Sequence, residues 1–230
     1  MNQAVVFWSG GKDAAMALHR ANQNPQIRVV GLVTTLNKDL NETAVHKIPE
    51  AVLDRQAKQT GLPLRKMWVK EMPGNKEYEK ALSGVYSQLK KEGINTVIYG
   101  DIFLEDIKAY REDLIEKAGL KALFPLWRID SRTLMNNFIA FGFKAIICNI
   151  NSAVLPKSFL GRELNARFLS EVPPGVDPAG ENGEFHTFCF DGPVFRKPVE
   201  FSTGGKHISS VTLGSPDQKI NYKSGYLDIL

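Results

Sequence analysis

The sequence predicts an α/β fold, with a parallel, Rossmann-like sheet followed by a smaller C-terminal α/β domain. Short unbroken apolar runs, beginning with residues 4–8, are typical of strands buried on both faces of a parallel sheet. Helical spacing of apolar residues fills the stretches between these runs, which favours parallel strands joined by right-handed helical crossovers. A glycine turn at Gly10 and Gly11 joins the first run directly to a helical stretch. Such sheets bind ligands at their carboxyl edge.

Strand and helix patterns alternate through the first half of the chain. The expected strands are at residues 4–8, 27–35, 64–69 and 96–99, and the expected helices cover residues 14–20, 49–61, 78–93 and 105–119. Gly61, Gly93 and Gly119 mark helix ends, because glycine readily adopts the left-handed conformation that closes a helix.

The pattern changes from Pro125 onward, so we place a domain boundary near residue 125, between residues 1–125 and 126–230. Ser131 is expected to cap a helix that runs through Phe141. A buried strand at 144–149, a helix over 164–169 and a tail that alternates as strands from Phe185 are expected to follow.

One segment of the tail, Ser202–Lys206, looks like a phosphate-binding loop because it contains Gly-Gly-Lys. No helical pattern follows it, so no helix N-terminus would face the turn. With strand-like flanks on both sides, the segment predicts a hairpin turn.

Composition narrows the function only a little. The 230 residues are 43% hydrophobic and carry a formal net charge of +4, which is compatible with ATP, RNA or an acidic protein partner. No dense basic run is present, which disfavours binding of a nucleic acid such as tRNA. Cys148 and Cys189 lie in apolar runs and are expected to be buried free thiols. No signal peptide or membrane-spanning stretch is recognisable, and we expect a cytoplasmic protein.

The first candidate site is the loop Ser9–Asp13. Glycines let a phosphate approach the backbone, and the following helix N-terminus presents unpaired N–H groups and positive dipole. The nucleotide contacts predicted here are Ser9, Gly10, Gly11, Lys12 and Asp13, with adenine near the backbone of Val33 and Thr34. Asp13 is also a candidate magnesium ligand, because Mg²⁺ combines few carboxylates with phosphate oxygens and water. The alternative is a tight turn into a helix.

The second candidate site is Gly180–Phe188, where two carboxylates, an amide, an imidazole and a hydroxyl follow a Pro-rich loop. On a strand, Glu184 and His186 would face the same side and could supply acid–base groups. Alternatively, these side chains satisfy buried turn amides. Asp101 ends a strand on the binding edge, where it could contact a ligand or a metal, or cap the next turn.

These motifs resemble those of a known family. Ser9–Asp13 is similar to the Ser-Gly-Gly-x-Asp-Ser/Thr loop of the PP-loop ATP pyrophosphatases, and together with Gly180–Thr187 it resembles the diphthine–ammonia ligases of that superfamily. Gly100–Ile102, Pro125–Trp127 and the segment from His46 to Gln56 support the resemblance. Ala14 replaces a usual hydroxyl and Ala179 a frequent cysteine, which suggests a divergent member, and similar chains occur in bacteria.

The resemblance implies an ATP- and Mg²⁺-dependent amide synthesis. The carboxylate of diphthine, a modified histidine of elongation factor 2, would attack the α phosphate of ATP and release pyrophosphate. Ammonia would then displace AMP and give diphthamide. Bacteria lack diphthamide, so a bacterial member would act on another carboxylate. An ATP-binding domain (1–125), an acceptor-binding domain (126–230) and a homodimer are compatible with this resemblance.

The resemblance also assigns roles to individual residues. The catalytic candidates are Lys12, Asp13, Asp101, Glu184 and His186. The candidates for binding the acceptor or ammonia are His46, Gly100, Asp101, Glu181, Asn182, Gly183, Glu184, His186 and Thr187. We expect the C-terminal segment to close over the carboxyl edge of the sheet and face Lys12 and Asp101 across a cleft.

Two other functions remain open from the sequence. A tRNA-modifying enzyme of the same superfamily would also adenylate its substrate, but the apolar settings of both cysteines argue against thiolation. A module that binds AMP or ATP without turnover would need no acid–base cluster, so Glu184 and His186 argue for catalysis.

Overall fold

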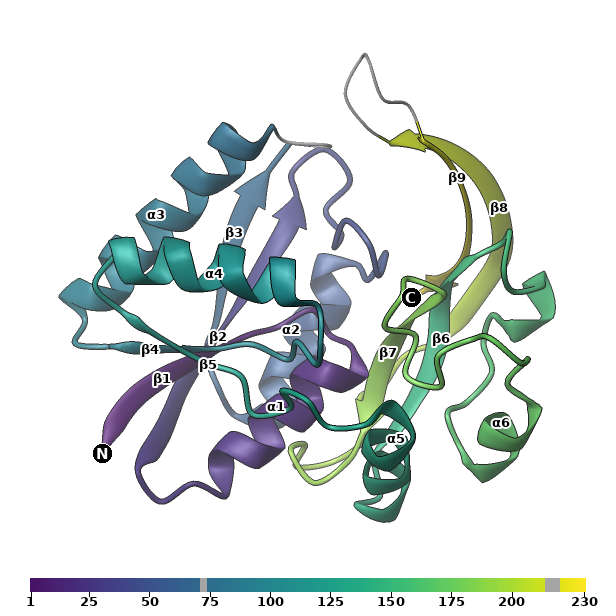
Figure 1. The fold of residues 1–230 in the computed structure, drawn as a ribbon, viewed down its shortest axis with the longest axis horizontal. Helices are drawn as coiled ribbons and strands as arrows, with labels where there is room; N and C mark the ends of the chain where they lie inside the picture. Colours follow the sequence, from purple (N-terminus) through teal and green to yellow (C-terminus); the bar gives the residue numbers. More distant parts are fainter. Residues whose placement is uncertain (71–73, 214–219) are drawn as a thin grey trace.

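The computed structural model describes residues 1–70, 74–213 and 220–230, which form two sheets with their helices (Figure 1). The first half of the chain contains β1 (Asn2–Phe7), α1 (Lys12–Asn22), β2 (Ile27–Asn37), α2 (Glu50–Thr60), β3 (Leu64–Val69), α3 (Asn75–Lys91), β4 (Thr96–Ile98), α4 (Glu105–Lys117) and β5 (Lys121–Leu123). The second half contains α5 (Ser131–Ala140), β6 (Lys144–Asn151), the 3₁₀ helix η1 (Lys157–Phe159), α6 (Ala166–Glu171), β7 (Phe185–Asp191), β8 (Thr203–Leu213) and β9 (Ile220–Ile229).

The first sheet is parallel, with strand order β3-β2-β1-β4-β5. Successive residues of β1 point to opposite faces, so Val5 packs in a core with α3 and α4, whereas Ala4 and Val6 pack in a core with α1 and α2. The chain builds β2 and β3 on one side of β1 and then returns to build β4 on the other. The strand order therefore reverses between β1 and β4, which is where open α/β sheets bind ligands.

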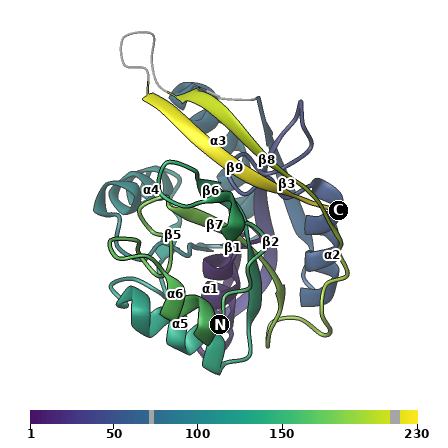
Figure 2. The same ribbon diagram turned by 90° about the vertical axis from the view of Figure 1, so that its right-hand side faces the viewer.

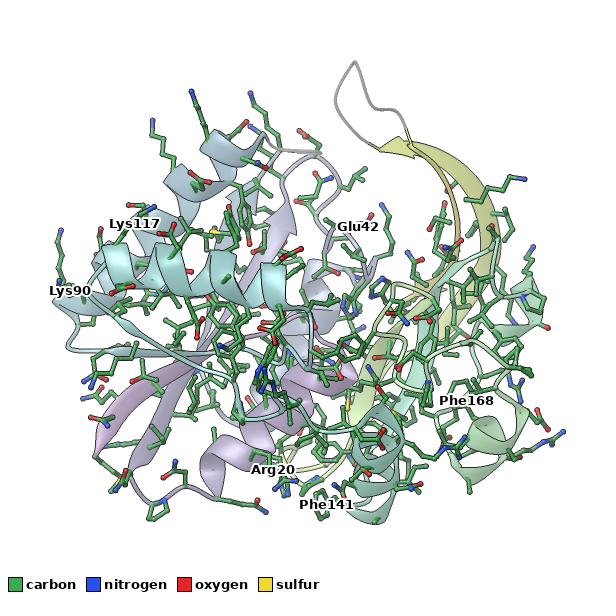
Figure 3. All side chains as sticks on the ribbon, viewed as in Figure 1. Arg20, Glu42, Lys90, Lys117, Phe141 and Phe168 are labelled. Carbon is green, nitrogen blue, oxygen red and sulfur yellow. The ribbon has the colours of Figure 1, made fainter. Side chains whose placement is uncertain are left out.

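The second sheet is antiparallel, with order β7-β6-β9-β8, and lies beside α1 (Figures 1 and 2). One hydrophobic core continues from the inner face of the parallel sheet through α1 into this second sheet, and its members range from Ala4 to Ile229. Phe168 of α6, labelled in Figure 3, belongs to the same core. The predicted α/β fold with a smaller C-terminal α/β part is confirmed.

Two details of the predicted elements differ from the structure. One strand of the first half was not predicted, and the capping residue of α5 was predicted one residue too late. The short strand β5 was not predicted, because its three residues between Gly119 and Phe124 carry too little pattern. Asp130, rather than Ser131, caps α5: its carboxylate accepts a hydrogen bond of 2.9 Å from the Thr133 N–H. Both residue types favour this position, so the sequence located the helix start only to within one residue.

The predicted hairpin turn at Ser202–Lys206 is also wrong. Gly204 and Gly205 lie inside β8, at a register shift in its pairing with β9. The Asp228 carboxylate of β9 accepts a hydrogen bond of 3.0 Å from the Gly205 N–H, which holds the chain extended there. Glycine pairs mark bulges as well as turns, and here the bulge forms.

Both thiols are buried and unpaired, as expected for Cys148 and Cys189. Burial raises the pKa of each well above its usual value, so neither is a reactive thiolate. Within the described ranges, every helix is too short or too polar to cross a membrane.

Candidate functional site

A cavity of about 720 Å³ opens at the carboxyl ends of β1 and β4. Its walls come from six parts of the chain: the end of β1 with the following loop and the start of α1, Thr34 and Thr35 of β2, residues 43–46, Tyr78 of α3, the segment from Tyr99 to Arg111, and residues 180–187. The C-terminal segment thus faces Lys12 and Asp101 across a cleft, as the sequence predicted. The volume lies in the range of pockets that hold nucleotides and other small molecules.

The loop Ser9–Asp13 needs both of its glycines. Gly10 has a positive φ of 82°, and a Cβ atom on Gly11 would lie 2.6 Å from His46 Cε1. The Gly11 N–H donates to Ser9 Oγ over 3.2 Å. Ser9, Lys12 and Asp13 line the cavity themselves, and so does Ala14, which brings the first turn of α1 to its wall.

The second sheet supports this loop directly. Thr187 Oγ1 of β7 accepts a hydrogen bond of 3.0 Å from the Lys12 N–H, and the Cys189 N–H donates to the Gly10 carbonyl over 2.9 Å. The first loop is therefore fixed by a strand that begins more than 170 residues later in the chain.

A buried amide, Gln56 of α2, supports the loop from behind. Its Nε2 donates to the carbonyls of Gly10 (2.9 Å) and Cys189 (2.6 Å), and its Oε1 accepts from Trp8 Nε1 over 3.0 Å. This positioning residue was missed in the sequence. The signal that could have found it is a polar glutamine on the helix side that helical spacing assigns to the apolar Val52 and Leu53.

Lys12 is nearly inaccessible, with 4% of its side chain exposed. Its ammonium donates to both Asp13 carboxylate oxygens, at 2.9 and 2.8 Å, and lies 3.7 Å from Glu181 Oε1. Burial alone would lower the Lys12 pKa, but the two carboxylates outweigh it and raise that pKa. Lys12 is therefore a buried charged amine held by carboxylates at the cavity wall.

Negative charge exceeds positive charge around Lys12. Burial first, and then the nearby Asp13 carboxylate, raise the pKa of Glu181 to about 8, against the opposing effect of Lys12. Asp177 and Asp101 add to the rise. This arrangement favours either a proton on Glu181 or an additional cation beside it.

The imidazoles of His46 and His186 lie beside each other, with ring centroids 5.1 Å apart. Burial lowers the pKa of both, that of His186 to about 3. The Nδ1–H of neutral His46 donates to the Thr187 carbonyl over 2.8 Å, which leaves Nε2 as an acceptor. The pair thus contributes neutral acceptor nitrogens to the cavity lining.

Glu184 is placed differently from the sequence-based expectation. It lies in the turn before β7, so it does not share a strand face with His186, and it does not line the cavity. Its carboxylate accepts from the N–H groups of Asp177 and Asn182, both at 2.9 Å, and from the Asn182 side-chain amide at 3.1 Å. Glu184 therefore holds the shape of the loop that presents Glu181, Asn182 and Gly183 to the cavity.

The wall beneath α4 contains Gly100 and Asp101, with Arg111 above them. A Cβ atom on Gly100 would lie 2.8 Å from the Asp13 backbone, so only glycine allows this approach. Arg111 Nε lies 3.0 Å from an Asp101 carboxylate oxygen, and its guanidinium lies 4.4 Å from the centre of the Tyr99 ring. Arg111 was not singled out in the sequence, because nothing in the helical pattern separates it from the other charged residues of α4.

The predicted adenine contacts are only partly at the cavity. Thr34 lines it, and its hydroxyl is buried without a hydrogen-bond partner among the described residues. Val33 is fully buried in the core on the α3 and α4 side, and its carbonyl accepts from the Trp8 N–H over 2.7 Å.

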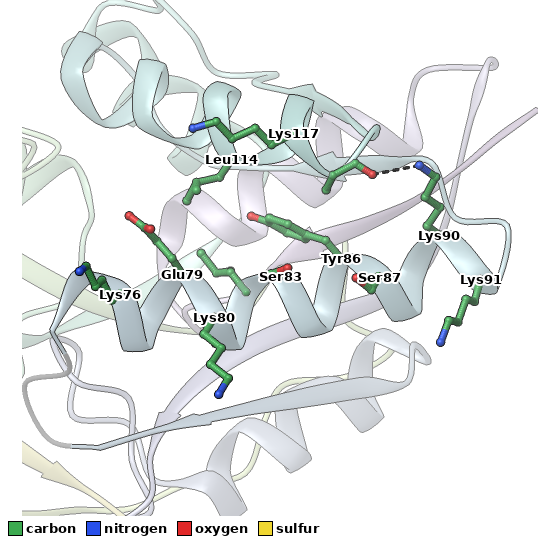
Figure 4. A pocket seen from close by; sticks show the side chains of 12 residues that line it. Lys76, Glu79, Lys80, Ser83, Tyr86, Ser87, Lys90, Lys91, Leu114 and Lys117 are labelled. Carbon is green, nitrogen blue, oxygen red and sulfur yellow. Dashed lines mark hydrogen bonds between the residues drawn. The ribbon is translucent and has the colours of Figure 1, made fainter.

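A second hollow, of about 750 Å³, lies between α3 and α4 on the outer side of the molecule (Figure 4). Its lining includes Lys76, Lys80, Lys90, Lys91 and Lys117. Lys90 donates to the Ala118 carbonyl over 3.2 Å, so that lysine caps the end of α4. None of the predicted site residues lines this hollow.

Comparison with known proteins identifies, in both halves of the chain, the family that the two sequence motifs resemble. Residues 2–122 match the diphthamide synthase N-terminal domain, and residues 130–227 match the diphthamide synthase C-terminal domain. A diphthine–ammonia ligase of Rattus norvegicus is 26% identical over 93% of this chain and 88% of its own length. Those of Homo sapiens and Danio rerio are 23% and 27% identical, over 98% and 86% of this chain and 92% and 85% of their own lengths. With both domains matched in order, and with the glycine loop and the Gly180–Thr187 loop facing one cavity, the chain belongs to the diphthamide synthase family.

Proposed function

We propose that this protein is an ATP-dependent amide-forming ligase. It would adenylate a carboxylate with release of pyrophosphate, and then transfer the acyl group to ammonia, converting diphthine to diphthamide or amidating a related acceptor. The observation that carries the proposal is the single cavity shared by the loop after β1 and the loop at 180–187. The relatives' printed name, diphthine–ammonia ligase, supports the same reaction.

The nucleotide would bind with its phosphates at the N-terminus of α1. Ser9, Gly10 and Gly11 shape the loop, and Lys12 would move from Asp13 to the phosphates as negative charge arrives. Adenine or ribose would occupy the wall at Thr34, whose buried hydroxyl has no other described partner. The backbone of Val33 would hold this wall in place.

The residues beside Lys12 fit a magnesium ion that arrives with the nucleotide. Among the described residues, no cluster of three or more His, Cys, Asp or Glu side chains could bind a metal by itself. Asp13 would supply a carboxylate oxygen to Mg²⁺, while phosphate oxygens and water supply the rest. The bound ion would neutralise phosphate charge, and it would offset the excess negative charge around Glu181.

The acceptor carboxylate and ammonia would meet between Asp101 and the loop at 180–187. A nitrogen lone pair of ammonia attacks the acyl carbon, the carbon–oxygen bond to AMP breaks, and the nitrogen loses one proton. The neutral His46 and His186 pair can accept N–H hydrogen bonds, and Glu181 would take the released proton once it has ionised beside the bound cation. Gly100, Asn182, Gly183 and Thr187 would shape the site, with Glu184 as a positioning residue. A closed cavity would keep water from the acyl-adenylate.

We further propose that residues 1–125 bind ATP and residues 126–230 bind the acceptor. The acceptor would be elongation factor 2 carrying diphthine, or another carboxylate in an organism that does not make diphthamide. We place the reaction in the cytoplasm and treat a homodimer as compatible with it. Both thiols are too deeply buried to support the thiolation chemistry of a tRNA-modifying enzyme.

A pyrophosphate-release assay tests the proposal. With ATP, ammonium and elongation factor 2 carrying diphthine, the wild-type protein is expected to release pyrophosphate and form the amide. His186→Ala should depress this acceptor-dependent release while ATP binding stays nearly intact. His207→Ala is the control, since His207 is 44% exposed and pairs with Asp228 outside the cavity. Equal effects of the two substitutions would contradict the assignment of His186.

A further inference from the structure

Arg111 gives the candidate acceptor wall a cationic group that the proposed function does not yet use. Among the described residues that line the cavity, Lys12 and Arg111 are the two lysine or arginine side chains. Lys12 is the first residue of α1, directly after the glycine loop that would bind the phosphates. Arg111 comes from α4, above the carboxyl end of β4.

The guanidinium of Arg111 is held firmly. It lies 4.4 Å from the centre of the Tyr99 ring, and Tyr99 is fixed in turn by the rings of Phe7 (5.0 Å) and Phe124 (5.6 Å) and by a 2.6 Å hydrogen bond with the Tyr86 hydroxyl. A stacked, planar guanidinium has little freedom left to lose when it binds an anion. This wall is therefore preorganised.

The pairing with Asp101 leaves hydrogen-bonding capacity unused. Arg111 Nε and Asp101 Oδ2 are 3.0 Å apart, yet both atoms are shielded from solvent and have no hydrogen-bond partner among the described residues. The ion pair is thus close but poorly aligned. Arg111 lines the cavity and 28% of its side chain is exposed, so the ion pair of its Nε with Asp101 leaves part of this cation accessible.

We propose that Arg111, positioned by Tyr99 and Asp101, binds the carboxylate of the acceptor through its terminal nitrogens. Planar N–H groups match the two oxygens of a carboxylate. A carboxylate bound here would lie on the β4 side of the switch point, with the nucleotide loop after β1 on the other side. This inference rests on the proposed function, because the acceptor must bring a carboxylate to the α phosphate.

The first experiment compares substrate constants for Arg111→Gln, Arg111→Lys and wild type. With elongation factor 2 carrying diphthine as acceptor, Arg111→Gln is expected to raise the acceptor KM by about 10- to 100-fold, the scale of a lost charge-assisted hydrogen-bond pair. The acceptor KM of Arg111→Lys should lie between those of wild type and Arg111→Gln, because lysine keeps the positive charge but lacks the paired, planar N–H donors of the guanidinium. The Kd of α,β-methylene ATP, measured by calorimetry, should stay within twofold of wild type.

Lys108→Gln is the matched control. Lys108 lies on the same helix, has similar side-chain exposure (23%), and pairs with Glu112 away from the cavity lining. An unchanged KM in Arg111→Gln, or an equal rise in Lys108→Gln, would overturn the proposal. A loss of nucleotide affinity as large as the loss of acceptor affinity would assign Arg111 to the phosphates instead, and would also overturn it.

The second experiment needs no knowledge of the natural acceptor. The protein is labelled with ¹⁵N-arginine and loaded with α,β-methylene ATP, and the Arg111 Nε–H signal is assigned by its absence in Arg111→Gln. Acetate is expected to shift this signal saturably, whereas chloride at equal ionic strength should not. Absence of a specific acetate shift would overturn the inference. A specific shift in a protein that releases no pyrophosphate with diphthine would support the carboxylate site while rejecting diphthine as acceptor.

Discussion

At the residue scale, Glu181 has a pKa of about 8, which follows from burial and from the charge of Asp13. The folded state holds this proton more tightly than the unfolded chain, in which the ordinary glutamate pKa is near 4.5. Ionisation therefore disfavours the folded state, and the free energy of unfolding falls as pH rises between about 4.5 and 8.

Glu181→Gln should remove that dependence. We expect the stability of the variant relative to wild type to increase as pH rises from 5 to 8 and to level off above 8, since the amide does not ionise. Urea denaturation at a series of pH values measures this difference. A difference that stayed constant across the range would show that Glu181 titrates normally in the folded protein.

Ala14 offers a second prediction at the same scale. It lines the cavity in the first turn of α1, where related loops carry a hydroxyl. Ala14→Ser is expected to tighten ATP binding by about 0.5–1.5 kcal/mol, the net value of one hydrogen bond. Calorimetry measures the affinities for ATP and for adenosine, and only the affinity for ATP should increase. An equal gain for adenosine would place the new hydroxyl away from the phosphates.

Among the elements, α2 has the clearest structural task, because its Gln56 joins Trp8 at the end of β1, the glycine loop and β7. The Gln56→Leu variant would leave the Trp8 indole N–H and the carbonyls of Gly10 and Cys189 with fewer partners in a buried site. We expect the free energy of unfolding to fall by about 3 kcal/mol, since each unsatisfied buried group costs about 1–3 kcal/mol. Gln88→Leu, on the exposed face of α3, should change it by less than about 0.5 kcal/mol. If urea denaturation gave equal losses of unfolding free energy for Gln56→Leu and Gln88→Leu, the positioning role of Gln56 would be contradicted.

The elements also show where sequence reasoning succeeds. Helix ends were predictable at Gly61 and Gly119 because a left-handed closing residue is a local requirement, and both have positive φ. Gly204 and Gly205 were misassigned because a bulge depends on the facing Asp228, which lies far along the chain. The cavity residues of both motifs were predictable from their chemistry. Arg111 was not predictable, because its place at the cavity depends on tertiary contacts. For Glu184 the sequence left two tasks open, and the structure shows the alternative in which its carboxylate accepts from turn amides.

At the scale of the whole molecule, the two sheets share one continuous core that reaches from Ala4 to Ile229. We therefore expect residues 1–125 and 126–230 to unfold together. Urea unfolding can be followed by tryptophan fluorescence, which reports the surroundings of Trp8, Trp68 and Trp127. It can also be followed by far-ultraviolet circular dichroism, which reports the helices and strands of the whole chain. The two transitions should coincide. Separate midpoints would show that the sheets are independent folding units.

The support of the glycine loop by β7 has a consequence for how the protein is made. The ribosome synthesises Ser9–Asp13 among the first residues, yet the Thr187 hydroxyl and the Cys189 N–H that fix this loop are added only near the end of translation. A nascent chain lacking β7 would contain every residue of the phosphate loop without its final supports. Nucleotide binding should therefore arise late in synthesis, after β7 has left the exit tunnel, and truncated translation products would compete little for ATP.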